Sequence, residues 1–166
     1  MQCESQTVEQ LLLVAKEITA KVPCCWAVTV DQRSGANARL VQPFFSQLDQ
    51  GGWIVRFLTS RGSRKAAEIA RSGRITLGYQ YDAEQAYVTL VGAASIVDDR
   101  DYLHDKWRAE WNVFFPNGPS DMDAVIVEVA VERIETWNLV RKIAASPNGL
   151  RPATLQRAAS GGWRSV

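Results

Sequence analysis

Short runs of alternating apolar and polar residues, joined by turn-forming segments, dominate this sequence and limit the folds it can adopt. The runs cover residues 24–30, 37–43, 53–58, 75–81, 86–97 and 124–137. Their two-residue period is that of strands with at least one buried face. Segments 31–36 and 82–85 are short enough to be hairpin turns. Many hairpin-linked strands with few helices predict a mainly β fold, an antiparallel barrel of about six to seven strands with peripheral helices.

Three helices are expected around these strands. Thr7 and Gln10 have capping-box spacing before an apolar helical face that Pro23 ends. Ser63 is a good N-cap and Gly73 a good left-handed C-cap for a second helix. A third helix is predicted from about residue 100 to residue 111, and residues 44–52 are predicted to be a connection.

The last predicted strand of the barrel, residues 124–137, contains a break in its alternation. Val125, Val127, Val129 and Val131 share one parity and Ile134 has the other, which predicts a β-bulge near residue 132 or 133. Gly92 on the preceding strand is a second candidate bulge position. Residues 144–166 are read as a C-terminal tail, in which residues 150–157 are a candidate last strand that turns through 160–162 toward Trp163.

Length, composition and charge limit the classes of protein to which this chain can belong. A chain of 166 residues with 46% hydrophobic content suits one domain over residues 1–166. A net charge of +1 does not indicate a nucleic-acid-binding surface, and no apolar run approaches a membrane span. Three cysteines, two of them adjacent, fit neither a disulfide framework nor a zinc site. With no secretion signal in view, the expected location is the cytoplasm.

The stretch from Trp53 to Lys65 contains the residues of a candidate anion-binding site. A strand runs into a loop of hydroxyls and cations that opens the second helix, so Arg64 and Lys65 fall in its first turn. Cations there oppose the helix dipole, and the free N–H groups of the turn need an acceptor. A bound phosphate would relieve both penalties. Local spacing alone leaves open the alternative of solvated charges on a surface loop.

The order of these segments resembles a known family. The residues that carry the likeness are Arg39 to Pro43, Trp53 to Thr59 followed by Ser63-Arg64-Lys65, Tyr87 to Gly92, Trp111 with Phe115-Pro116, and Glu135 to Trp137. Over about residues 8–137 the chain resembles the general stress protein 26 group of the pyridoxamine 5'-phosphate oxidase-like family, which are FMN-binding, Greek-key-like split barrels. The resemblance implies a homodimer with a flavin in each of two clefts between the subunits.

The resemblance also implies roles for individual residues. Arg39 would reach the phosphate, and the backbone of Leu40, Val41 and Gln42 would hydrogen-bond the flavin ring. The phosphate clamp would be completed by Thr59, Ser63, Arg64 and Lys65, and Leu58 at the strand end would be a further cofactor-binding residue. A ring contact is implied for Tyr87, and a flavin contact for the tail residue Arg151. Trp111 and Trp137 would reach the cofactor from the partner subunit. For the aromatic residues, packing within the sheet or core is the alternative.

The function implied is that of an FMN-dependent oxidoreductase linked to stress, with FAD as a possible cofactor and a small molecule as substrate or electron donor. The alternative is a non-catalytic protein that binds or senses flavin or haem. Where the oxidase has a substrate-binding histidine in its tail, this chain has Leu150-Arg-Pro-Ala153. Oxidation of pyridoxamine phosphate itself is therefore not expected.

Overall fold

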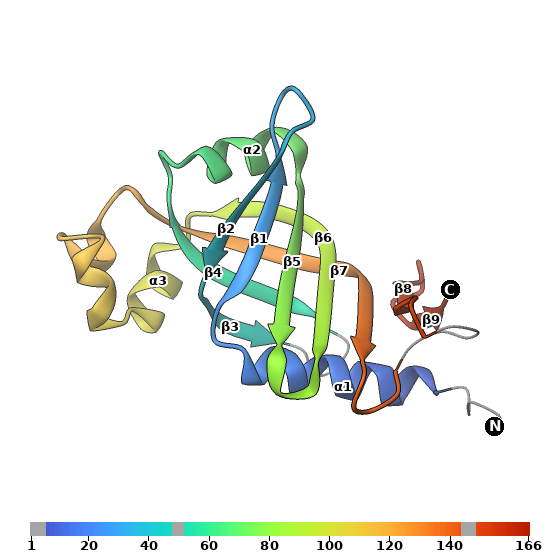
Figure 1. Cartoon of the computed structure of the whole chain (residues 1–166). Helices are drawn as coiled ribbons and strands as arrows, with labels where there is room; N and C mark the ends of the chain where they lie inside the picture. The colour runs from blue at the N-terminus through green and yellow to red at the C-terminus, as the bar shows by residue number, and fades with distance from the viewer. Residues whose placement is uncertain (1–5, 48–51, 144–148) are drawn as a thin grey trace.

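The computed structural model describes residues 6–47, 52–143 and 149–166, which form a curled antiparallel sheet with three α-helices (Figure 1). The strands are β1 (Cys25–Val30), β2 (Ala36–Val41), β3 (Pro43–Gln47), β4 (Ile54–Ser60), β5 (Arg74–Tyr81), β6 (Ala86–Val97), β7 (Ala124–Asn138), β8 (Ala153–Arg157) and β9 (Trp163–Ser165). The helices are α1 (Val8–Lys21), α2 (Arg64–Ser72) and α3 (Arg100–Lys106), with short 3-10 turns η1 (Asp82–Glu84), η2 (Ala109–Val113) and η3 (Gly118–Ser120).

The strands form one sheet in the order β2-β1-β5-β6-β7-β4-β3, with β8 added to β7 and β9 to β8. β2 and β3 are at opposite ends of this order, yet only Gln42 separates them in the chain. The sheet must therefore curl until its two ends meet at Gln42, which gives the half-barrel in Figure 1. The predicted mainly antiparallel barrel with peripheral helices is confirmed, with nine strands in the described residues in place of six to seven.

Two predicted segments differ from the structure. Residues 44–47 belong to β3, which pairs with β4 through Ser46↔Val55 and Gln47↔Ile54, so the predicted connection was wrong there; residues 48–51 lie outside the described residues. Only one residue separates β3 from β2, which hides a second strand from pattern analysis. The third helix ends at Lys106 because Trp107 leaves helical geometry, and Trp111 lies on η2.

The predicted bulge in β7 is present. Val91 pairs with Arg133 and Gly92 pairs with Val131, so Glu132 is the extra residue. A Cβ atom on Gly92 would lie 2.1 Å from the carbonyl oxygen of Ala130, and glycine is therefore required at this close approach. β7 pairs with β4 before the bulge and with β8 after it.

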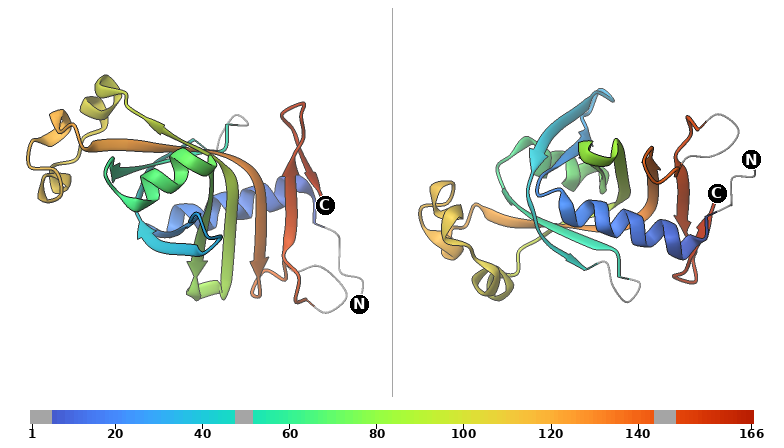
Figure 2. Two further views of the ribbon diagram at one scale, coloured as in Figure 1. Left: turned by 90° about the horizontal axis from the view of Figure 1, so that it is seen from above. Right: turned by 60° about the horizontal axis from the view of Figure 1, so that its bottom comes forward.

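Helix α1 crosses the lower end of the barrel (Figures 1 and 2), and its predicted capping box is present. Its buried residues Leu11, Ala15 and Ile18 join the main hydrophobic core. A second cluster of buried residues, which includes Leu103 and Phe115, fixes the lobe formed by α3, η2 and η3 against the barrel. None of the helices in the described ranges has the length and apolar character that a transmembrane span requires.

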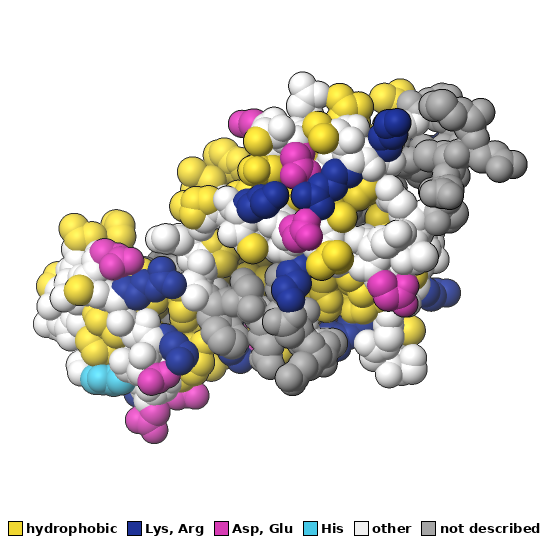
Figure 3. All heavy atoms as spheres, turned by 90° about the horizontal axis from the view of Figure 1, so that it is seen from below, with side chains coloured by type: hydrophobic (Ala, Val, Ile, Leu, Met, Phe, Trp, Pro, Cys, Tyr) yellow, Lys and Arg dark blue, Asp and Glu magenta, His cyan; other side chains and the backbone are white. Residues whose placement is uncertain are grey.

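Charged side chains of both signs are interspersed on the face seen from below in Figure 3. At this end of the barrel Arg141 forms ion pairs with Glu17 of α1 and Glu84 of η1, at 2.5 and 2.6 Å. Glu84 also pairs with Lys21 at 3.4 Å. These contacts hold the helix, the turn after β5 and the end of β7 together.

Candidate functional site

A cleft of about 530 Å³ lies where the ends of β2 and β4 meet α2 and the lobe. We call it the Lys65 cleft. It is lined by Cys24, Leu40, Val41, Gln42, Leu58, Thr59, Ser60, Lys65, Trp111, Phe114, Phe115 and Asp123. Its walls are thus two strand ends, a helix start and an aromatic lobe.

Lys65 is the cation of this cleft. Its Nζ donates a hydrogen bond of 2.7 Å to Oγ1 of Thr59, which is only 4% exposed. Ser63 caps α2 by accepting from the backbone N–H of Ala66 at 3.3 Å, and its Oγ lies 3.3 Å from that of Thr59. Burial lowers the pKa of Lys65, and the positive charge of Arg39 lowers it further. An anion bound beside the ammonium would oppose both effects, because it would stabilise the charged form.

Asp123 supplies a carboxylate on the same cleft, but its oxygens are already committed. Oδ1 accepts from the backbone N–H of Gly62 at 3.0 Å. A hydrogen bond from Ser60, followed by that from Gly62, lowers the pKa of Asp123. The carboxylate therefore fixes the loop that leads into α2, and in the described residues no carboxylate lies within ion-pair distance of Lys65.

Strand β2 forms the second wall. Within the described sheet it pairs only with β1, through registers such as Trp26↔Leu40 and Cys25↔Val41. The other edge of β2 thus carries backbone N–H and C=O groups without a strand partner. Leu40, Val41 and Gln42 line the cleft at this edge, where a planar ligand with hydrogen-bonding groups would find donors and acceptors.

The aromatic wall comes from the lobe. Trp111 is 6% exposed and makes edge contacts with Phe44, at 5.0 Å between ring centroids, and with Trp107, at 5.5 Å. Phe114, beside it in the cleft, is 74% exposed. One aromatic side chain is therefore fixed by packing, and the other is presented to solvent at the cleft.

Arg39 and Arg64 do not line the Lys65 cleft. The guanidinium of Arg39 donates to the carbonyl oxygen of Asn37 at 2.8 Å and to Oε2 of Glu68 at 3.2 Å. Arg64, whose side chain is 71% exposed, lies 3.8 Å from Oε1 of Glu68. Hydrogen bonds from Thr29, then from Arg39, lower the pKa of the buried Glu68. Both arginines thus meet at Glu68, and their predicted phosphate contacts stay predictions.

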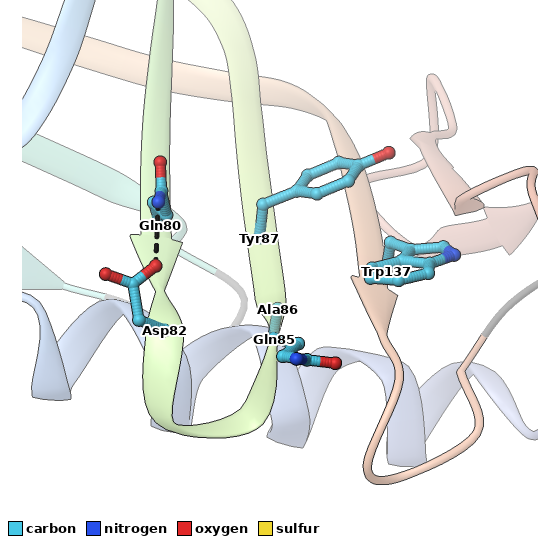
Figure 4. A pocket seen from close by; sticks show the side chains of 6 residues that line it. All are labelled: Gln80, Asp82, Gln85, Ala86, Tyr87 and Trp137. Carbon is cyan, nitrogen blue, oxygen red and sulfur yellow. Dashed lines mark hydrogen bonds between the residues drawn. The ribbon is translucent and has the colours of Figure 1, made fainter.

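Tyr87 and Trp137 lie in a different place, a pocket of about 400 Å³ at the ends of β5, β6 and β7 (Figure 4). They are directly opposite each other on β6 and β7, with ring centroids 6.2 Å apart and planes 15° apart. Nε1 of Trp137 donates to the carbonyl oxygen of Gly149 at 2.7 Å. Gln80, Asp82 and Gln85 add polar groups around the pair. Cross-strand packing, the alternative considered for Tyr87, is therefore present.

The structure divides the predicted site residues into groups. The Lys65 cleft brings together Leu40, Val41, Gln42, Leu58, Thr59, Lys65 and Trp111, with Ser63 behind Thr59. Tyr87 and Trp137 form the second pocket, and the exposed Arg151 lines neither one.

Sequence reasoning missed five residues of the cleft: Cys24, Ser60, Phe114, Phe115 and Asp123. Phe115 could have been predicted, because it is one of the residues that carry the family resemblance. No pattern in the sequence pointed to Cys24 as a binding residue. Among the described residues no group of three or more His, Cys, Asp or Glu side chains is placed to hold a metal ion.

The chain matches one protein family and is similar to several solved structures. The family described as "Pyridoxamine 5'-phosphate oxidase like" matches residues 14–153. No curated protein matches in sequence.

Solved structures of proteins from several bacteria share the fold. A protein of Clostridium acetobutylicum related to general stress protein 26 is 17% identical, with a TM-score of 0.73 over 90% of this chain and 96% of its own. A general stress FMN/FAD binding protein of Xanthomonas citri is 14% identical, with a TM-score of 0.63 over 80% and 90%. A heme binding protein of Mycobacterium smegmatis is 16% identical, with a TM-score of 0.59 over 76% of this chain and 53% of its own.

Proposed function

Because the chain belongs to the pyridoxamine 5'-phosphate oxidase-like family, we propose that it is a flavoprotein that binds FMN in the Lys65 cleft. The proposal rests on the surroundings of Lys65. Its ammonium is partly buried, at the start of a helix, and is hydrogen-bonded to a neutral hydroxyl instead of a carboxylate. A phosphate group would supply the missing negative charge and would accept from the hydroxyls of Thr59 and Ser63.

The rest of the cleft fits the flavin ring. The free edge of β2 at Leu40, Val41 and Gln42 would hydrogen-bond its polar side. Trp111 and Phe114 would cover its apolar side and exclude water. FAD is a further possibility, and the structural neighbour from Xanthomonas citri is described as binding FMN or FAD.

We also propose that the functional unit is a homodimer. Tyr87 on β6 and the Lys65 cleft at the edge of β2 lie on different strands of one sheet, with β1 and β5 between them. At about 4.8 Å per strand, β2 and β6 are roughly 14 Å apart. In the homodimer that the resemblance implies, the second group would come from a partner copy. Trp26, 47% exposed, and Leu40 lie side by side on the intervening outer face and offer an apolar surface for that contact.

The proposed activity is that of a flavin-dependent oxidoreductase acting on a small molecule, with a role in stress as the names of its structural neighbours suggest. When bound, the flavin supplies the hydride or electron chemistry. The protein then needs only to position the ring, to neutralise the phosphate and to keep water out. This division of labour is consistent with a cleft in which Asp123, the only carboxylate among the described residues that line it, is committed to the loop before α2.

A second candidate function is non-catalytic binding of a flavin or haem. The observation in its favour is the structural similarity to a heme binding protein. The chain's one histidine, His104, is exposed on the lobe and does not line the Lys65 cleft. Haem held in that cleft would therefore need a different axial ligand.

The visible spectrum of the purified protein, followed by titration with FMN, tests flavin binding. We expect flavin absorbance or saturable binding with a stoichiometry of one FMN per chain. A colourless protein that fails to bind added FMN would reject the flavin proposal, and haem titration would then test the second candidate. Reduction of the bound flavin by a nicotinamide or deazaflavin donor separates an oxidoreductase from a protein that only holds flavin.

A further inference from the structure

Glu68 is a buried carboxylate on α2, three residues after Lys65, and is only 5% exposed. Side chains three residues apart on a helix are neighbours, and glutamate and lysine at this spacing commonly form an ion pair. In the described residues Glu68 and Lys65 form none, and Nζ of Lys65 donates to Oγ1 of Thr59 instead. The one carboxylate on α2 therefore does not neutralise the lysine.

Side chains of β1 and β2 hold Glu68. Its Oε2 accepts from the hydroxyl of Thr29 and, at 3.2 Å, from Nη2 of Arg39. Its Oε1 accepts from Nδ2 of Asn37 at 2.8 Å. The hydrogen bond from Thr29, followed by that from Arg39, lowers the pKa of Glu68, so the carboxylate is charged at neutral pH. Of these three partners only Arg39 carries the opposite charge.

Arg39 is itself fixed by groups of the protein. Its Nη1 donates to the carbonyl oxygens of Asn37 and Ala27, at 2.8 and 3.4 Å, and to the hydroxyl of Thr29. Its side chain is 20% exposed and does not line the Lys65 cleft. Burial and then the positive charge of Arg39 lower the pKa of Lys65, so the two cations are close to each other. Arg39 therefore lies beside the cleft with its guanidinium committed to β1, β2 and Glu68.

We propose that Arg39 supports flavin binding indirectly, as a positioning residue that holds the carboxylate of Glu68 away from Lys65. The inference rests on the proposed function of the Lys65 cleft. Without Arg39, Glu68 would be a buried charge that lacks its ion-pair partner, with a lysine three residues away on the same helix. A Lys65 ammonium paired with Glu68 would offer less charge to a phosphate, which would also be repelled by the carboxylate.

Arg64 is a weaker substitute for Arg39. Its Nε lies 3.8 Å from Oε1 of Glu68, but its side chain is 71% exposed, so water screens its charge. Lys65 is partly buried, and a buried carboxylate interacts more strongly with a cation that is shielded from water. Loss of Arg39 should therefore bring Glu68 and Lys65 together.

The test is a double-mutant cycle on FMN affinity, measured by fluorescence titration of the full chain. Arg39→Met removes the charge and keeps most of the aliphatic stem, and Glu68→Gln removes the other charge with little change of shape. Arg39→Met should weaken FMN binding about tenfold, which lies within the coupling measured between members of one ion-pair network. Adding Glu68→Gln should restore most of that loss, because an amide does not neutralise Lys65. If Arg39 contacted the phosphate itself, Glu68→Gln would restore nothing.

A second measurement needs no flavin. The pKa of Lys65 can be followed by NMR of protein labelled with carbon-13 lysine. Glu68→Gln should lower this pKa more in the Arg39→Met background than in the wild type, because only in that background is the carboxylate free to pair with the ammonium. If the wild type does not bind FMN, the proposed function fails, and this titration still decides whether Arg39 keeps Glu68 from Lys65.

Arg74→Met is the matched control, because it removes an arginine that pairs with a different carboxylate, Glu132, at 2.6 Å. It should leave FMN affinity and the pKa of Lys65 unchanged. The proposal is overturned if Arg39→Met and Arg74→Met have equal effects, if the double variant binds FMN no better than Arg39→Met, or if Glu68→Gln shifts the pKa of Lys65 equally in both backgrounds. Thermal unfolding checks each fold. Should Arg39→Met alone fail to fold, the double variant, which has no unpaired buried charge, decides by whether its FMN affinity is near that of the wild type or about tenfold weaker.

Discussion

Substitution of Gly92 by alanine should destabilise the protein strongly, because β6 and β7 approach each other most closely at the bulge. The new Cβ would lie 2.1 Å from the carbonyl oxygen of Ala130 and 2.9 Å from its carbonyl carbon. Both are backbone atoms, so the strands would have to separate by about 1 Å to restore ordinary contact distances. Overpacking of this kind costs about 1–3 kcal/mol, and the loss of a neighbouring ladder hydrogen bond adds about 0.5–1.5 kcal/mol.

One effect works in the opposite direction. Alanine loses less backbone entropy than glycine on folding, which returns roughly 0.5–1 kcal/mol. The net loss in the free energy of unfolding is then roughly 0.5–4 kcal/mol, centred on about 2 kcal/mol. For a chain of this size the central value corresponds to a fall in Tm of roughly 4–8 °C.

Gly78→Ala is the matched control on β5. A Cβ there would meet Trp26 Cβ at 3.9 Å, which is ordinary contact, so the entropy gain should leave Tm unchanged or slightly raised. Urea unfolding and differential scanning calorimetry of both variants measure the difference. Equal Tm values for Gly92→Ala and Gly78→Ala would refute the argument that backbone proximity at the bulge requires glycine.

Three further predictions concern charge, thiols and assembly. Hydrogen bonds from Arg141, then from Asn138, lower the pKa of Glu84 from 4.5 to about 2. This carboxylate therefore stabilises the fold above pH 4.5, and the contribution is lost as pH falls toward 2. Glu84→Gln should reduce stability at pH 7 and flatten this acid limb in urea unfolding, and an unchanged limb would contradict the assignment. Burial raises the pKa of Cys25 to about 12, whereas Cys24 is exposed. Peptide mapping after brief iodoacetamide treatment should therefore find Cys24 modified and Cys25 intact. Labelling of both thiols in the folded protein would contradict this prediction. Trp26→Glu on the outer sheet face should convert the proposed dimer to a monomer in light scattering at micromolar concentration, and a wild-type protein that is already monomeric would rule the dimer out.

Elements whose determinants are local in sequence were predictable. Ser63 and Gly73 do bound α2, since a cap depends on residues within one turn. The bulge at β7 followed from the change of parity between Val131 and Ile134. Strand β3 was missed because Pro43 and the single intervening residue Gln42 hide the boundary between two strands at opposite edges of the sheet.

The candidate site was predictable only in part. Sequence placed Arg64 and Lys65 in the first turn of α2, but successive helical residues point about 100° apart, and the tertiary contacts decide which of them enters the cleft. Thr59 holds Lys65 in the Lys65 cleft, and Glu68 lies with Arg64 on the other side. The bond from Arg39 to Glu68 joins residues 29 positions apart, and no local pattern reveals such a partner.

The most direct test of the central claim, that Lys65 holds the phosphate of FMN, is FMN affinity measured by fluorescence titration for the wild type, Lys65→Ala and Arg64→Ala. Each substitution removes one positive charge from the same turn, but only Lys65 lines the proposed site. We predict that Lys65→Ala loses about 1.5–3 kcal/mol of binding free energy, or roughly 10–150-fold in Kd, from one charge-assisted hydrogen bond. Arg64→Ala should cost less, because the guanidinium of Arg64 lies outside the cleft, 3.8 Å from Oε1 of Glu68. Equal losses in the two variants, or a larger loss in Arg64→Ala, would contradict the account.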